Sequence, residues 1–127
     1  MIITVDFETY YDKEFSLSKI TTEEYVRDER FETIGVGVKV DDGETQWFSG
    51  THKETQAFLS QYDWGASLVL AHNTAFDGAI LSWVFGVTPK GWLDTLCMAR
   101  AVHGVDVGGS LKFLAEKYEI GQKGTEV

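Results

Sequence analysis

The chain has 127 residues, 43% of them hydrophobic, which fits one globular domain that needs no disulfide or structural metal to fold. Its formal net charge of −9 counts against unaided binding to nucleic acid, because phosphate contacts depend on Lys and Arg. The apolar runs are too short for a membrane span, no signal peptide is expected, and the single Cys97 cannot form an internal disulfide, so a cytoplasmic protein without membrane contact is expected.

The first half of the chain has the patterning of strands around a short helix. A strand is predicted over residues 2–7, followed by a helix in "TTEEYVRDER" that Thr21 or Thr22 caps. Apolar residues alternate in "FETIGVGVKVDDGETQWF", with a turn at Asp42-Gly43, and this pattern predicts a β-hairpin.

The second half should contain one buried strand among helices. A helical pattern over 52–62 precedes the wholly apolar "SLVLAHN", which is typical of a strand buried between helices. Helices are predicted over 74–87, from Asp94 to about Val102, and through "LKFLAEKYEI". The order of elements predicts a single α/β domain over 1–127, with a mixed sheet and helices on its faces.

Two acidic residues stand at the end of the first predicted strand. Asp6 and Glu8 in "VDFET" are two positions apart, so their side chains face the same side of a strand, about 7 Å from each other. Such like charges are tolerable in solvent or around a cation, and Mg²⁺ prefers oxygen ligands of this type. The pair therefore indicates either a solvated strand end or part of a divalent-metal site, through which an acidic protein could hold a polyanion.

Two further acids fall where helices should begin. Asp77 in "AHNTAFDGAIL" lies in a first turn, where Thr74 and Asp77 have the spacing of a capping box. A carboxylate at this strand-to-helix junction also points toward the strand ends, so capping and metal binding are compatible. Asp94 in "WLDTLCMAR" is predicted as an N-cap, and Cys97 as a small buried residue of the helix that follows.

"VDFET" and "HNTAFD" together resemble the first two motifs of the DEDD superfamily of 3′–5′ exonucleases, which have a ribonuclease-H-like fold. "DTLCMAR" and "GGSLKFLAEKYEIG" are similar to the segments between that family's second and third motifs. The run "DFETYYDKEFSLSKITTEEYVRDERFETIGVGVKVDDGE" further resembles the N-terminal proofreading domain of phage-type family-A DNA polymerases. The resemblance covers nearly the whole chain and implies a ribonuclease-H-like mixed sheet flanked by helices.

The third motif of the family, Tyr-x-x-x-Asp or His-x-x-x-Asp, is not found. Tyr118 is followed four residues later by Gln122, and His103 by Val107. The other acids of this region are expected to be ordinary surface residues: Asp106, Glu116, Glu119 and Glu126. We therefore expect a C-terminally incomplete exonuclease domain, a fragment of a longer chain in which a polymerase domain follows.

For a complete domain, the resemblance implies hydrolysis of the 3′-terminal phosphodiester of single-stranded DNA with two Mg²⁺ or Mn²⁺ ions. Asp6 would bridge both ions, Glu8 would bind the ion beside the nucleophile, and Asp77 the ion beside the leaving group. Contacts to the substrate would come from Thr9, Tyr10, Asn73 and Phe76, although core packing is also expected of Phe76. Without the fourth carboxylate, this chain alone should have little or no activity and bind at most one ion weakly.

Three alternatives stay open. The first is a stand-alone exonuclease that acts on RNA or short oligonucleotides. The second is a non-catalytic module that keeps the exonuclease fold for binding or assembly, which the unidentified third motif and the acidic charge favour. The third is an α/β domain whose acids only cap helices and meet solvent.

Overall fold

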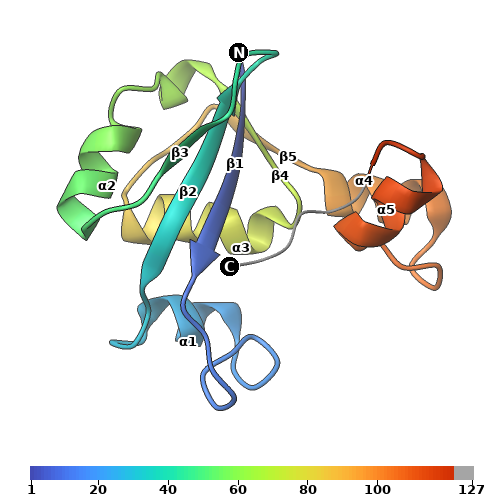
Figure 1. Ribbon diagram of the computed structural model, residues 1–127, viewed down its shortest axis with the longest axis horizontal. Helices are drawn as coiled ribbons and strands as arrows, with labels where there is room; N and C mark the ends of the chain where they lie inside the picture. The colour runs from blue at the N-terminus through green and yellow to red at the C-terminus, as the bar shows by residue number, and fades with distance from the viewer. Residues whose placement is uncertain (122–127) are drawn as a thin grey trace.

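Five strands form one mixed sheet in the order β3-β2-β1-β4-β5 in a computed structural model that describes residues 1–121 (Figure 1). The strands are β1 (Ile2–Thr9), β2 (Thr33–Val40), β3 (Gln46–Phe48), β4 (Leu68–Ala71) and β5 (Gly91–Asp94). β2 lies antiparallel to β1 and β3, whereas β4 and β5 run parallel to β1. This arrangement confirms the predicted α/β class with a mixed sheet.

Helices connect the strands, and Figure 1 shows α3 behind the sheet, α2 at its β3 side and α4 with α5 at its β5 side. The helices are α1 (Thr22–Arg27), α2 (His52–Leu59), the short 3₁₀ helix η1 (Trp64–Ala66), α3 (Thr74–Ala79), the π-helical turn η2 (Ile80–Val84), α4 (Thr95–His103) and α5 (Leu111–Lys117). Thr21, one of the two predicted caps, caps α1 and forms a capping box with Glu24. Within residues 1–121, no helix is long and apolar enough to cross a membrane.

The two faces of β1 differ sharply in character. Ile3, Val5 and Phe7 point into the core, where they meet Val36 and Val38 of β2, all at most 4% exposed. The alternate residues of the strand, including Asp6 and Glu8, point to the opposite face, because side chains alternate along a strand. We call this second surface the acidic face of the sheet. β1 therefore joins the hydrophobic core to the candidate site.

Three local predictions were wrong. β1 continues to Thr9, two residues beyond the predicted strand, so Glu8 lies within the strand rather than after it. β5 was missed, because "GWLD" is a short edge strand with two apolar residues and no alternation long enough to recognise. Cys97 is exposed, since α4 buries little of its surface against the sheet.

Candidate functional site

A buried carboxylate connects the end of β1 to the start of α3. β4 pairs with β1 from Ile2 to Thr4, so the last residues of β1 extend beyond that pairing. There the backbone N–H of Phe7 donates to Oδ1 of Asp77 at 2.9 Å. The side chain of Asp77 therefore takes the place of a neighbouring strand, and it meets β1 at the residue between Asp6 and Glu8.

The electrostatics of Asp77 show that the three acids share one neighbourhood. Asp77 is 4% exposed, and burial raises the pKa of its carboxyl to about 7. The hydrogen bond from Phe7 works in the opposite direction, while the charges of Asp6 and Glu8 raise the pKa further. The fold thus places Asp77 within electrostatic reach of Asp6 and Glu8, from which about 70 positions separate it in the sequence.

Asp94 organises the beginnings of two helices. At α3 it takes the place of the capping box that was predicted between Thr74 and Asp77. Its carboxylate accepts the backbone N–H groups of Asn73 at 2.9 Å and Thr74 at 3.0 Å before α3, and that of Leu96 at 2.9 Å in α4. Desolvation raises the pKa of Asp94, but these hydrogen bonds outweigh it and hold the pKa at about 2. The predicted N-cap role of Asp94 is confirmed, whereas Asp77 does not cap α3.

A pocket of about 440 Å³ opens beside the acidic residues of β1. The described residues that line it are Asp6, Phe7, Glu8, Thr9, Tyr11, Ser16, Leu17, Ser18, Tyr25 and Phe76. Thr9 and Phe76, two of the predicted substrate contacts, are therefore in the pocket wall. Thr9 shares a hydrogen bond of 3.0 Å with the hydroxyl of Tyr25, and the ring of Phe76 packs against that of Tyr25.

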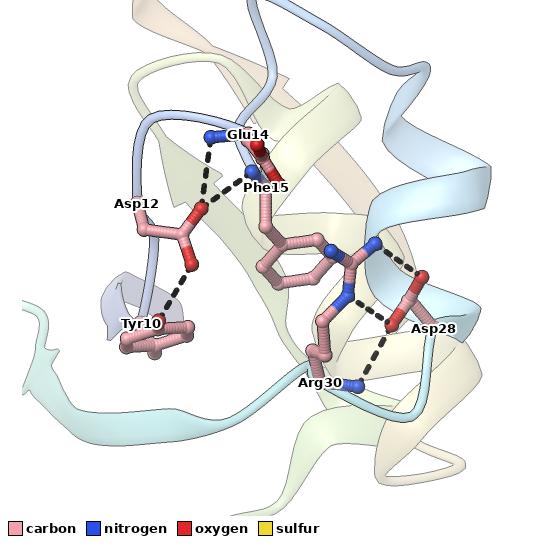
Figure 2. Close-up of polar contacts among 6 residues, drawn as sticks. All are labelled: Tyr10, Asp12, Glu14, Phe15, Asp28 and Arg30. Carbon is pink, nitrogen blue, oxygen red and sulfur yellow. Dashed lines mark hydrogen bonds and ion pairs between the residues drawn. The ribbon is translucent and has the colours of Figure 1, made fainter.

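Residues of the loop after β1 also line this pocket, and Figure 2 shows the contacts that hold the loop. Asp12 accepts the backbone N–H groups of Glu14 and Phe15 and the hydroxyl of Tyr10, at 2.7 to 2.9 Å. The guanidinium of Arg30 lies 4.4 Å from the centre of the Phe15 ring. These contacts fix the loop so that its next residues face the acidic residues.

The loop residue that lines the pocket differs from the one that the sequence predicted as a substrate contact. Tyr10 turns its hydroxyl to Asp12 and its ring to Phe15, away from the pocket, whereas Tyr11 lines it. Asn73, another predicted contact, lies at the start of α3 with a left-handed φ of 78° and lines neither pocket. The sequence of this loop has no periodicity from which the position of Tyr11 could be predicted.

A second pocket, of about 270 Å³, adjoins the first at Asp6. His72 and Thr95 are in its wall, and neither was singled out from the sequence. The Nε2 of His72 lies 2.7 Å from the carbonyl oxygen of Gly109, which only accepts, so this nitrogen carries the proton. Nδ1 shares a hydrogen bond of 2.9 Å with the hydroxyl of Thr95, so contacts at both ring nitrogens fix the imidazole in one orientation.

The residues considered for a third motif lie elsewhere. His103 Nε2 and the Tyr118 hydroxyl are hydrogen-bonded to each other at 2.5 Å across α4 and α5. Figure 1 shows this helix pair well to one side of the end of β1. Gln122 and Glu126 lie outside the described residues.

The donor chemistry of the three acids fits a hard divalent cation, which prefers carboxylate oxygens. A cation would also offset the unfavourable charge of the buried Asp77 and its two neighbours. However, in the described part of the chain no three His, Cys, Asp or Glu side chains already stand as a group that could hold a metal. The site therefore has suitable ligands and shared electrostatics but no closed ligand set.

Comparison with known proteins identifies the fold. No protein-family model and no curated protein matches the chain. Brucella melitensis NrnC bound to pGG is 16% identical, with a TM-score of 0.70 over 99% of this chain and 56% of the NrnC chain. NrnC with bound Mg²⁺ is 15% identical, with a TM-score of 0.68 over 99% and 57% of the two chains.

A nuclease in its apo form is 20% identical, with a TM-score of 0.68 over 97% of this chain and 54% of its own. The chain thus spans slightly more than half the length of these neighbours. At sequence identities this low, the structural similarity shows a shared fold and nothing more. The five-stranded mixed sheet with its flanking helices is of the ribonuclease-H-like type.

Proposed function

We propose that this chain carries part of the active site of a divalent-metal-dependent 3′–5′ exonuclease that acts on RNA or short oligonucleotides. The observation that carries the proposal is the position of Asp77, whose buried carboxylate is bonded to β1 between Asp6 and Glu8. A protein gains no stability from three neighbouring acids, one of them buried, so the arrangement favours a role in binding cations.

Asp6, Glu8 and Asp77 would hold Mg²⁺ or Mn²⁺ in this proposal. The bound ions would supply an activated water molecule and stabilise the departing 3′ oxygen. The chain itself would orient these ligands: β1 presents Asp6 and Glu8 on its acidic face, and the Phe7 N–H keeps Asp77 directed at them. No aspartate of a third motif is recognised in the sequence, so catalysis by this chain alone should be slow or undetectable.

The pockets on either side of Asp6 would receive the 3′ end of a single strand. Thr9 and Phe76 stay candidates for contacts to the terminal nucleotide, and Tyr11 joins them because it lines the larger pocket. Tyr10 and Asn73 would act at most indirectly, because their described contacts are to Asp12 and Asp94. Aromatic side chains suit unstacked bases, which a single-stranded end supplies.

The neighbours support a nuclease of short oligonucleotides over the proofreading domain of a DNA polymerase. One neighbour is a nuclease, and NrnC was captured both with pGG and with Mg²⁺. The resemblance of residues 6–44 to a phage polymerase domain has no counterpart among these neighbours. One observation favours the non-catalytic alternative, namely that no closed metal-ligand group exists within residues 1–121.

The proposal is tested by Mn²⁺ binding, followed by electron paramagnetic resonance. We expect the wild-type chain to bind Mn²⁺ weakly, and Asp6→Asn and Asp77→Asn each to weaken binding at least about tenfold, the usual order for losing a charged ligand. Asp63→Asn is the matched control, because Asp63 is exposed and its side chain makes no cap at η1. Mn²⁺ binding that neither site substitution alters would contradict the site.

A second assay separates the catalytic from the non-catalytic reading. Labelled RNA and DNA oligonucleotides are incubated with the chain and Mn²⁺, and the products are resolved by length. Slow shortening from the 3′ end that Asp6→Asn abolishes supports the exonuclease. Mn²⁺ binding through Asp6 without any shortening supports the non-catalytic module.

A further inference from the structure

An exposed tryptophan shares the acidic face of the sheet. β3 pairs Trp47 with Gly37 of β2, and β2 pairs Gly37 with Asp6 of β1. Because directly paired residues of antiparallel strands point to the same face, Trp47 and Asp6 project from the same side of the sheet. Trp47 is 54% exposed, so most of its indole ring meets solvent.

The indole lies against the backbone of β2 next to Glu8. A Cβ atom added at Gly35 would lie 2.3 Å from Cζ2 and 2.5 Å from Cη2 of Trp47. Gly35 is the residue of β2 that pairs with Glu8. Only a glycine therefore allows the ring of Trp47 to lie over the backbone of the residue that pairs with Glu8.

A second glycine on this face is not explained by internal packing. A Cβ atom added at Gly37 would meet only the Thr45 methyl at 3.8 Å and the Asp6 carbonyl oxygen at 3.9 Å, which are ordinary contacts. Glycine in a strand interior costs stability and often marks a place where a ligand approaches the backbone. The indole covers Gly35, whereas Gly37 leaves a patch of bare backbone between Trp47 and Asp6, the residues with which it pairs.

One cation is available on the same face. Lys39 lies two residues after Gly37 in β2, so it is on the same face of the sheet. It pairs with Thr4, two residues before Asp6. The 11 Lys and Arg of the chain are outnumbered by 20 Asp and Glu, so the net charge of −9 opposes phosphate binding. Affinity for a nucleic acid would therefore depend on metal ions and on stacking, which is insensitive to net charge.

We propose that Trp47 is a stacking platform for one base of a single-stranded substrate, with the bare backbone at Gly37 as the floor between this base and the acidic residues. The inference rests on the proposed function and adds a positioning residue to it. The occupant is a nucleobase because the platform combines an exposed indole face, direct continuity with Asp6 and Glu8, and a neighbouring Lys39 that can meet a phosphate.

The test is a double-mutant cycle in which the Trp47→Leu substitution is combined with removal of single bases from the bound strand. Binding of short labelled single strands is measured by fluorescence anisotropy with Ca²⁺, using strands in which an abasic nucleotide replaces each position in turn. In the wild type, one abasic position should weaken binding about tenfold, as expected for one stacked base. In Trp47→Leu, the intact strand should bind about tenfold more weakly, and that abasic position should have no further effect.

Two further variants complete the experiment. Trp83→Leu is the matched control, because Trp83 is 49% exposed but belongs to η2 and contacts Arg27. Gly37→Val keeps Trp47 but fills the open space over Gly37, and it should weaken binding several-fold while the protein keeps its circular dichroism spectrum.

The outcomes for the platform and for the proposed function are distinguishable. If Trp47→Leu binds every strand like the wild type, or if no strand binds the wild type, the platform is overturned, whatever the Mn²⁺ assay shows. If Mn²⁺ binding is insensitive to Asp6→Asn but the coupling between Trp47 and one base persists, the platform stands and the nuclease does not.

Discussion

Replacing Asp77 with Asn should stabilise the metal-free protein at neutral and alkaline pH. Asp77 is 4% exposed, and its pKa is raised to about 7 by burial and, in addition, by the charges of Asp6 and Glu8. Asn carries no charge, but its amide oxygen can still accept the Phe7 N–H that now lies 2.9 Å from Oδ1. The substitution thus removes a buried charge and keeps its hydrogen bond.

The magnitude follows from the difference in pKa between the folded and unfolded chain. A carboxyl group with a pKa of about 7 when folded and 3.8 when unfolded binds its proton more tightly in the folded state. The wild type therefore loses stability as the pH rises from about 4 to about 7, and the loss is constant above that window. At about 1.4 kcal/mol per pKa unit, the full cost is about 4 kcal/mol.

We therefore expect Asp77→Asn to raise the free energy of unfolding by about 2 to 4 kcal/mol near about pH 8, and by about 1 to 2 kcal/mol near about pH 5. Urea unfolding, followed by tryptophan fluorescence in the presence of a chelator, measures both values. Asp63→Asn, a change of the same type at an exposed position, should have no effect at either pH. Added Mg²⁺ should stabilise the wild type but not Asp77→Asn.

One result would refute this reasoning directly. If Asp77→Asn were less stable than the wild type near about pH 8, the carboxylate would be a net stabilising group rather than a buried charge held for function. An equal gain at both pH values would also contradict it, because the cost of a buried charge depends on the fraction of the group that is ionised.

Other substitutions test the contacts that shape the site. Asp94→Ala should lower the free energy of unfolding by about 3 kcal/mol in thermal denaturation, because its carboxylate holds the starts of α3 and α4. Gly35→Ala should cost about 2 kcal/mol in urea, because its Cβ atom would overlap Trp47, whereas Gly65→Ala, with nothing within 4 Å, should cost little. Asp12→Ala should barely change global stability. It should speed the hydrogen exchange, measured by NMR, of the Glu14 and Phe15 amides, which donate to its carboxylate. Unchanged exchange would show that other contacts hold the loop.

Features that depend on neighbouring residues in the chain were predictable from the sequence. The core side of β1, the hairpin of β2 and β3, and the N-caps Thr21 and Asp94 follow from alternation and from the hydrogen bonds of short polar side chains. β5 was not predictable, because its four residues become a strand only by pairing with β4. Short edge strands take their structure from their neighbours rather than from their own sequence.

For the site, the sequence by itself determined which acidic residues are available. It also determined that Asp6 and Glu8 share one face of a strand, because side chains alternate along any extended backbone. Only the tertiary structure decided what Asp77 does. Its position in a first turn suits a cap equally well, and the N–H that it accepts belongs to Phe7, about 70 residues away. The same holds for Trp47, whose ring lies over Gly35, the partner of Glu8, because glycine leaves room for it there. Contacts of this range depend on sheet register and on the close packing of the folded chain, which local patterns do not encode.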